Sequence, residues 1–449
     1  MTQTAQDLTS GSLWKKILLF SFPLMLSNIL QVLFNMSDIA VVGHFAGSMA
    51  LGSVGSTSTL VTMFTGFLIG LSGGINVLTA LYLGARNRQA TSCTIHSAAI
   101  ISLVIGFVLA LAGIGFSRPL LTLLNTKEEL IDGAVLYLQI YFTGIPALAM
   151  YNFGNAVFSA AGDTKRPLRY LAAAGVLNVV LNLFFVIVLH MDVAGVGAAS
   201  AISQYISAIL IIRALFCSKE SYRLELHSLH LHPDKAKDIL RIGIPSGMQN
   251  TIFAIANLFI QVGVNSFSAV MVAGHSAAAN ADALIYDMMA AFYIACASFM
   301  SQNFGAGRRD RVLKSYLVSL AYSFGVGLVI GLLLILFGRP FLSLFTSDPQ
   351  VIAAGMKRLS IMGFSYCVSA FMDCTIAASR ALGKSLVPTA IVILGSCVFR
   401  VVWVYTVFAY FKTIPSLYLL YIFSWSITAV AEIVYFLRVY RQNILTRSY

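Results

Sequence analysis

The sequence predicts an all-α polytopic membrane protein with 12 transmembrane helices, arranged as two pseudo-symmetric six-helix lobes. Three observations support this prediction. First, 58% of the 449 residues are apolar and 10% are charged, whereas soluble domains carry about 25% charged residues. Second, apolar stretches of about 20 residues, which is the length needed to cross a bilayer, recur along the whole chain. Third, the two halves of the chain resemble each other at a nearly constant offset.

The apolar stretches place the spans in order along the chain. They lie near residues 14–38, 50–78, 93–116, 134–158, 168–190, 194–216, 237–262, 276–300, 315–337, 356–379, 387–410 and 415–439. The first stretch is too long for a signal peptide and contains an acid, so we expect no cleaved leader. The predicted organisation is an N-lobe (1–216), a cytoplasmic linker (217–234) and a C-lobe (235–449).

The basic residues predict the orientation of these spans. Most of the 29 Lys and Arg residues fall in segments that are cytoplasmic if the N-terminus lies inside the cell. The external segments hold six of them: Arg118, Lys127, Arg339, Lys357, Arg358 and Lys412. Arg400 alone is placed within a span. This positive-inside bias predicts cytoplasmic termini in a bacterial cytoplasmic membrane, and it explains the net charge of +12 without a nucleic-acid partner.

Cysteine and histidine are not expected to carry chemistry. The six cysteines are scattered and form no CxxC pair, so we expect reduced packing residues. The linker contains His227, His230 and His232, but no fourth ligand completes a metal site. We therefore expect a solvated linker and no cofactor.

The internal repeat has an offset of 221–222 residues. The matching pairs are Pro23 with Pro245, Asn35 with Asn257, 84–85 with 305–306, 117–121 with 338–342, Gly162 with Gly383, and Pro167 with Pro388. Each half has six spans, so both halves begin on the same side of the membrane. The sequence therefore predicts a parallel repeat, related by an axis along the membrane normal.

The first span carries a polar stripe. Ser27, Gln31, Asn35 and Asp38 recur at i, i+4, i+8 and i+11, which places them on one helical face. An acid inside a span costs about 2.5–3.5 kcal/mol, so it usually faces a cavity or a partner. Pro23 removes one backbone donor from the same helix and is the expected bend point, or hinge.

The remaining spans of the first half add polar residues at mid-depth. They are Tyr137, Asn152, Asn155, Asn178, Asn182, Ser200, Ser203 and Gln204. Asn and Ser can serve as hydrogen-bonding contacts between helices, at about 0.6 kcal/mol each, and for each of them this structural role stays open beside a functional one. Asp38 differs because a lone acid needs a proton, a cation or a basic partner.

The second half does not copy this chemistry. Its seventh span has Asn257 but no acid at the position of Asp38. Arg400 lies near mid-depth and cannot lose its proton, and Asp287 and Asp373 are its candidate partners. A structural ion pair and a transport role are both open for it.

Two further acids of the second half are expected near the membrane surfaces. We place Asp282 near the outer end of its span. Glu432 precedes Arg438 by six residues, and we expect its side chain to reach the inner surface.

The chain resembles the multidrug and toxic compound extrusion (MATE) transporters over nearly its whole length. The resemblance is carried by Pro23, Gln31, Asn35 and Asp38, by Asn155 with 162–167, by Asn178 and Asn182, and by 194–199, 243–245, 305–306 and 380–388. It implies two six-helix lobes in a V shape that export amphipathic organic cations in exchange for Na⁺ or H⁺.

The resemblance also implies roles for individual residues. Asp38, Tyr137, Asn178 and Ser200 match ion-coupling positions, so Na⁺ is possible at Asp38 and Asn178. Gln31 and Asn155 match substrate-facing positions, and Asn35 lies on the same helical face as Gln31.

The sequence departs from the family pattern at three places. Asn182 replaces an acid that usually follows the fifth-helix asparagine by one turn. Phe253 occupies the place of a seventh-helix Glu that matters in another branch of the family, and Asp373 lies about one turn deeper than the tenth-helix acid of that branch. We therefore expect no coupling role for the second lobe.

The function predicted from the sequence is an antiporter that works by alternating access. We expect a monomer in contact with lipid and with drug-like cations, and no enzymatic activity. One alternative is a flippase for a lipid-linked sugar, which the scarcity of Lys and Arg inside spans disfavours. The other is an intramembrane serine hydrolase, because residues 70–74 match GxSxG. That match lacks the strand-to-helix context and a nearby histidine.

Overall fold

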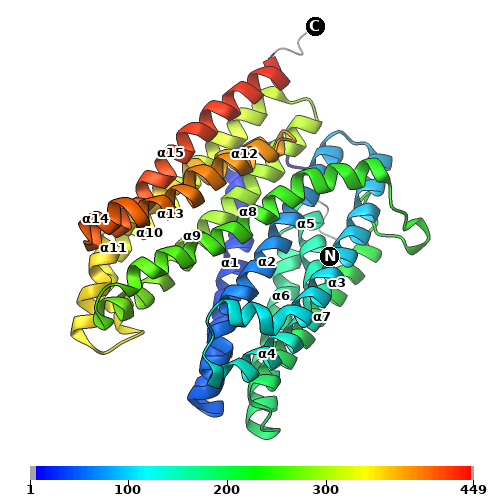
Figure 1. Ribbon diagram of the computed structural model, residues 1–449. Helices are drawn as coiled ribbons and strands as arrows, with labels where there is room; N and C mark the ends of the chain where they lie inside the picture. The colour runs from blue at the N-terminus through cyan, green and yellow to red at the C-terminus, as the bar shows by residue number, and fades with distance from the viewer. Residues whose placement is uncertain (1–6, 446–449) are drawn as a thin grey trace. The chain divides into compact units, whose positions relative to one another are not determined.

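The computed structural model describes residues 7–445, and these residues are almost entirely helical (Figure 1). The α-helices are α1 (Leu13–Val41), α2 (Gly47–Gly84), α3 (Arg88–Leu123), α4 (Glu128–Thr143), α5 (Ile145–Ala160), α6 (Lys165–Leu183), α7 (Asp192–Phe216), α8 (Pro233–Asn265), α9 (Ala269–Gly305), α10 (Arg309–Ser343), α11 (Pro349–Ala381), α12 (Leu386–Val392), α13 (Phe399–Trp403), α14 (Ala409–Phe411) and α15 (Ile414–Tyr440). Shorter helical turns join or extend them: η1 (Val42–Ala46), η2 (Phe184–Val188), η3 (Leu226–Ser228), η4 (Ile393–Val398), η5 (Val404–Phe408) and η6 (Arg441–Leu445).

Each of the 12 predicted spans falls on helical chain. The fourth span is α4 and α5 together, with a 46° bend between them, and the eleventh runs from α12 to α14 through two π-helical turns. By length and composition, nine helical segments of the described chain can cross a membrane, or ten if the bent pair is one span. The first of these segments, Leu13–Gly84, contains both α1 and α2. The predicted fold class is confirmed.

The described chain forms two compact units. One unit is built mainly from Leu26–Gly247, and the other from Leu8–Met25 together with the chain from Met248 onward. These units differ from the lobes predicted from the sequence, because α1 and α8 each pass from one unit to the other. Pro23 and Pro245 lie within three residues of the two crossing points, yet both helices continue through their prolines.

Close backbone contacts hold the first unit together. α2 packs against the start of α8, where a Cβ added to Gly74 would lie 2.7 Å from the backbone nitrogen of Gly243. α6 packs against α1, where a Cβ added to Gly175 would overlap the ring of Phe34. A Cβ at Gly74 would clash with backbone atoms, so glycine is required there, whereas a Cβ at Gly175 would displace the Phe34 ring beside the polar stripe of α1.

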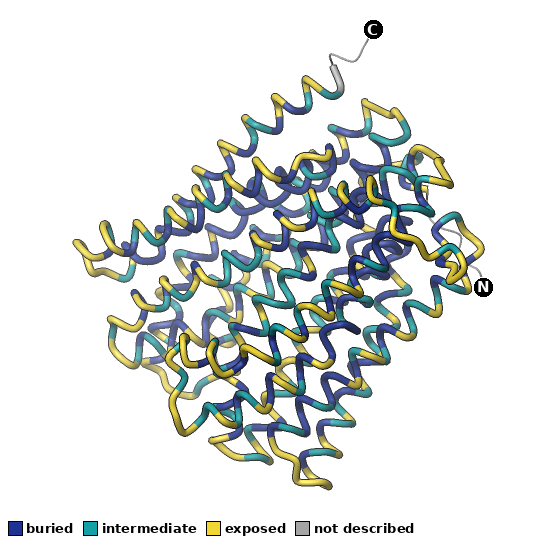
Figure 2. The backbone as a smooth tube through the Cα atoms, turned by 45° about the vertical axis from the view of Figure 1, so that its right-hand side comes forward, coloured by how far each residue is buried: buried dark blue, intermediate teal, exposed yellow. Residues whose placement is uncertain are grey.

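Helices α9, α10, α11 and α15 form the core of the second unit. The start of α1 joins this unit, and Phe20 contacts Phe299 edge to face at 5.5 Å between ring centroids. Large apolar side chains such as Leu111, Val180 and Leu336 are exposed on the helices, and exposed positions recur along them (Figure 2). Such exposure suits helices whose solvent is lipid.

Two predictions about charged residues of the second unit were wrong. Arg400 was expected to be the only arginine inside a span, but Arg358 of α11 is 1% exposed. Both of its terminal nitrogens bind the carboxylate of Asp282, one of them at 3.0 Å. Arg400 is therefore not the only arginine buried among the spans. Glu432 was expected to reach the inner surface, but it is 0% exposed, because its position on α15 faces the packed interior.

The linker is partly packed rather than fully solvated. Tyr222 and Leu224 are buried, and the ring of Tyr222 meets that of Phe158 edge to face. His227 and His230 are exposed, as expected for a solvated segment. No cluster of potential metal ligands occurs within residues 7–445.

Candidate functional site

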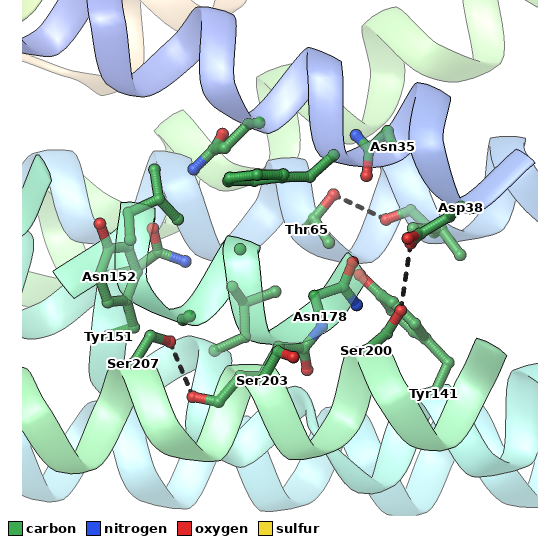
Figure 3. Close-up of a pocket in the computed structure, with 18 of the residues that line it drawn as sticks. Asn35, Asp38, Thr65, Tyr141, Tyr151, Asn152, Asn178, Ser200, Ser203 and Ser207 are labelled. Atoms are coloured by element: carbon green, nitrogen blue, oxygen red, sulfur yellow. Dashed lines mark hydrogen bonds between the residues drawn. The ribbon is translucent and has the colours of Figure 1, made fainter. Parts of the chain in front are cut away.

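The first unit contains a cavity of about 280 Å³ (Figure 3). Six helices contribute to its wall: α1, α2, α4, α5, α6 and α7. Its polar and aromatic lining residues include Gln31, Asn35, Asp38, Thr62, Thr65, Tyr137, Tyr141, Tyr151, Asn152, Asn178, Ser200, Ser203, Gln204 and Ser207. Phe34, Val61, Ile69, Leu148 and Leu171 supply apolar surface. The cavity is therefore amphipathic.

The polar stripe of α1 faces this cavity. Gln31, Asn35 and Asp38 all line it, as expected for residues spaced to share one helical face. Figure 3 shows Asn35 and Asp38 on α1 above the polar residues of α6 and α7. Because these residues share one helical face, the carboxylate of Asp38 lies inside the unit, although most of α1 is apolar.

Asp38 is held by two neutral hydrogen-bond donors. The side-chain amide of Asn182 donates to Oδ1, and Ser200 Oγ donates to Oδ2 at 3.3 Å. Asp38 has no ion-pair partner among residues 7–445, since none of the Lys, Arg or His nitrogens there lies within 4.0 Å. The charge of this carboxylate is therefore free to be met by a mobile cation.

Asn178 and Asn182 lie one turn apart on α6 and extend the network. The same Nδ2 of Asn182 that donates to Asp38 is 3.2 Å from Asn178 Oδ1. Asn182 is fully buried behind the cavity wall, and its Oδ1 has no hydrogen-bond partner in the described chain. The amide N–H groups of Asn182 thus sit between two oxygen acceptors.

Two tyrosines of α4 form an aromatic wall near this network. Tyr137 and Tyr141 are buried, and their rings stack with centroids 5.9 Å apart. Tyr137 was named from the sequence, whereas Tyr141 was not. The signal for Tyr141 is its position, because a residue four places after Tyr137 lies on the same face of a helix.

Asn155 of α5 was expected to face the substrate cavity. Asn155 does not line this cavity, but Asn152 and Tyr151, one turn earlier on α5, do. Thr62 and Thr65 of α2 were not predicted. Thr62, Thr65 and Ile69 are spaced three and four residues apart, which places them on one face of a helix. Threonine in an apolar helix is equally typical of a packing residue, so no clear signal in the sequence marks these two threonines.

The polar residues predicted in the second unit do not converge on one hydrogen-bonded site. Asn257 is exposed on α8, Asp287 is half-buried on α9, and Asp373 and Arg400 are buried. The expected ion pair between Arg400 and Asp287 or Asp373 is absent from the described residues. Neither acid approaches the guanidinium within 4.0 Å.

Arg380 is a half-buried arginine that was not predicted. It was named only as the start of the stretch 380–388 that carries the family resemblance, but it lies in the last turn of α11 and donates to Gln249 Oε1 at 2.8 Å. Asp373 and Glu432 are its electrostatic neighbours. Its sequence position at a helix end gave no indication of this inward orientation.

Ser72 is not arranged as a nucleophile. It lies in the middle of α2, a continuous helix, and its Oγ donates to the carbonyl of Ile69 in the preceding turn at 2.7 Å. A strand-to-helix elbow, which such a nucleophile needs, does not occur there. The GxSxG match reflects small residues on a packed helix.

Comparisons with known proteins agree with the repeat and with the fold. The family model described as MatE matches residues 23–184 and again 245–406, two matches separated by the offset seen in the sequence. The chain is 33% identical over 366 residues to "Probable multidrug resistance protein YpnP" of Bacillus subtilis (strain 168), which covers 81% of each chain.

Two further similarities extend over most of the chain. It is 25% identical over 412 residues to "Probable multidrug resistance protein NorM" of Thermotoga maritima, covering 89% of this chain and 86% of that protein. Among solved structures, "Outward-facing conformation of a multidrug resistance MATE family transporter of the MOP superfamily" superposes with a TM-score of 0.90, 21% identity and 99% coverage of both chains. The last similarity concerns the fold.

Proposed function

Because the chain belongs to the MATE family, we propose that it is a multidrug efflux transporter that exports amphipathic organic cations in exchange for an inward-moving ion. Family membership and the names of the relatives support the coarse function, which is transport of drugs across a membrane. The exchange mechanism is inferred from the cavity. Nothing in the cavity favours an enzyme or a lipid-linked sugar flippase.

The observation that carries the proposal is a single carboxylate, Asp38, in an amphipathic cavity without a basic partner in the described chain. An organic cation gains from the aromatic and apolar wall and from the charge of Asp38. A small cation bound to Asp38 removes that charge. The two ligands therefore oppose each other at one group, which is the thermodynamic basis of exchange.

We propose the proton as the coupling ion. Na⁺ prefers oxygen ligands, as hard cations do, and Asp38, Asn178 and Ser200 all present oxygens here. Asn182, however, directs its amide nitrogen at both Asp38 and Asn178, so in this orientation it is a donor and not an oxygen ligand for Na⁺. Binding Na⁺ would require the amide of Asn182 to turn so that its unpartnered Oδ1 faces inward.

We further propose that α1 transmits the change in charge. The first part of α1 belongs to the second unit and the rest to the first, and Pro23 lies beside the crossing point. A change at Asp38 therefore acts on a helix that both units share, near its missing backbone hydrogen bond. We place the protein as a monomer in the bacterial cytoplasmic membrane, with both termini inside.

Reconstitution in liposomes tests the proposal. A fluorescent organic cation is loaded, and its movement is followed while a pH gradient or a Na⁺ gradient is imposed separately. We expect the pH gradient alone to drive movement of the dye. Movement driven only by Na⁺ would replace the proton with sodium, and movement that responds to neither gradient would contradict the antiport mechanism.

A further inference from the structure

The second unit contains a buried cation for which the proposed exchange has no role. Arg400 lies in α13, is 3% exposed, and stays protonated at any accessible pH. An arginine buried in a membrane protein requires compensation by other groups. The identity of those groups decides whether the residue is structural or binds a ligand.

Aromatic rings surround the guanidinium on several sides. Its central carbon lies 4.8 Å from the ring centroid of Tyr421, 5.4 Å from that of Phe253 and 5.7 Å from that of Trp425. Phe253 comes from α8, and the other two rings come from α15, which runs beside α13 (Figure 1). Cation–π attraction stabilises a desolvated guanidinium by about 2 kcal/mol, so the rings explain how the charge is tolerated.

The hydrogen-bonding capacity of Arg400 is nevertheless mostly unused. Nε donates to Ser424 Oγ at 3.2 Å. Within the described chain, the two terminal nitrogens donate to no side chain or carbonyl. A guanidinium has five N–H bonds in a planar fork that matches a carboxylate. The edge of the fork that binds carboxylates is thus unpaired.

The acids of the second unit do not fill this edge. Asp373 is an electrostatic neighbour of Arg400, but it is also a neighbour of Arg380, and neither arginine contacts it within 4.0 Å. Glu432 interacts with Arg380 and Asp373 rather than with Arg400. By contrast, Asp282 binds the guanidinium of Arg358 with both of its carboxylate oxygens. The same unit thus contains one guanidinium whose terminal nitrogens are paired and one, Arg400, whose terminal nitrogens are not.

The electrostatic surroundings of Arg400 include an exposed residue. Tyr286 of α9 is an electrostatic neighbour of Arg400 and Asp373, and its side chain is 48% exposed. Arg400 itself is buried, and Tyr286 is an exposed residue in its electrostatic surroundings.

We propose that Arg400 with Phe253, Tyr421 and Trp425 forms an anion subsite that binds the carboxylate of a planar aromatic compound. The fork supplies a bidentate, charge-assisted contact, and the rings supply stacking surface. This proposal rests on the proposed efflux function and names a place in the second unit for the carboxylate of a substrate. Arg400 is then a specificity-determining residue.

Two dyes that differ in one group test this subsite. Rhodamine 110 has a free carboxyl group, and rhodamine 123 is its methyl ester. Fluorescence polarisation with the purified, detergent-solubilised chain gives a Kd for each dye, and the Kd ratio cancels general damage to the protein. We expect Arg400→Gln to shift this ratio against the free acid by about tenfold, the loss typical of one charge-assisted contact. We expect Arg400→Lys to shift it less, because a point charge replaces the fork.

Lys412→Gln is the matched control, because it removes a positive charge from the exposed surface of the same unit. It should leave the ratio unchanged. A shift as large as that of Arg400→Gln would mean that only overall charge matters, which would overturn the subsite. An unchanged ratio in Arg400→Gln would overturn it as well.

A measurement on the unaltered protein covers the case in which Arg400→Gln does not fold. Benzoate should displace rhodamine 110, whereas the neutral isostere benzamide should not, and equal displacement by both would overturn the proposal. These binding assays use no ion gradient. Failure of ion-driven export therefore leaves them readable, and failure of the subsite leaves export of the ester dye intact.

Discussion

The two units share a backbone plan but differ in their buried charge. Gly162 and its repeat partner Gly383 have φ values of 83° and 78°, so the same left-handed turn ends α5 and α11. The first unit holds one half-buried acid, Asp38, without a basic partner in the described chain, whereas the second holds the buried Arg358 and Arg400 and the half-buried Arg380, with several acids near them.

This difference separates two uses of a buried charge. A buried charge that is ion-paired or surrounded by aromatic rings keeps the same protonation state throughout the transport cycle, because separating a buried ion pair is costly. A carboxylate held only by neutral donors can gain and lose a proton with little rearrangement. The repeat preserves the helices of both units, and the exchange proposed above depends on Asp38 of the first unit alone.

The largest expected effect comes from neutralising acids in each unit in turn. Asp38→Asn should reduce gradient-driven dye movement in liposomes to the level of protein-free vesicles, because the amide cannot bind a proton or a cation. Asp373→Asn should retain measurable driven movement, because Asp373 does not line the cavity that holds Asp38. The proposed difference between the two units is contradicted if Asp38→Asn still transports the dye, or if both variants lose driven movement to the same extent. Thermal unfolding in detergent checks that each variant is folded.

The next effect contrasts two ion pairs. Arg358→Met breaks a pair whose guanidinium is 1% exposed, and it should cost about 3 kcal/mol, because Asp282 loses its cation in a partly buried place. Arg118→Met breaks a pair that is exposed on both sides in the first unit. Its cost should be below about 1 kcal/mol. Equal shifts in the thermal unfolding temperature would show that burial does not distinguish the two pairs.

A third prediction sharpens the identity of the ion. Asn182→Asp replaces the donor beside Asp38 with a second carboxylate, which supplies the oxygen ligands that Na⁺ needs. The Na⁺ concentration for half-maximal dye movement should fall by at least about tenfold, given the added Coulomb attraction. Asn152→Asp places an acid in the same cavity away from the Asp38 network and serves as the control. If the Na⁺ dependence of dye movement is unchanged in Asn182→Asp, then Asn182 is only a packing residue.

The sequence was sufficient to predict the fold and the polar face of α1. Span lengths follow from bilayer thickness, and the spacing that ends at Asp38 follows from the helical period. The roles of Asp38, Asn178 and Asn182 stay predictions. Tyr141 was not predicted, because nothing in the sequence around an aromatic residue of an apolar helix shows whether the residue lines a cavity or packs in the core.

Burial of charged residues was harder to predict. Arg358 and Asp282 are 76 residues apart, so their pairing depends on how α9 and α11 pack and not on either segment alone. Glu432 was misplaced for the same reason. The crossing of α1 and α8 between units also has no local signal beyond the two prolines, since each helix continues through its proline.

The smallest expected effect tests whether the repeat preserves the loops between helices. Arg86 and Gly307 are equivalent in the repeat and have φ values of 52° and 68°, and both are exposed. A left-handed conformation costs a residue with a Cβ about 1 kcal/mol relative to glycine. Gly307→Ala meets no atom within 4 Å of its new Cβ, so backbone strain alone should lower its thermal unfolding temperature by a few degrees. Arg86→Gly should raise the temperature by a similar amount, because it removes the same strain. Shifts of the same sign would mean that the two loops differ in backbone conformation, and the likeness of the units would then be limited to their helices.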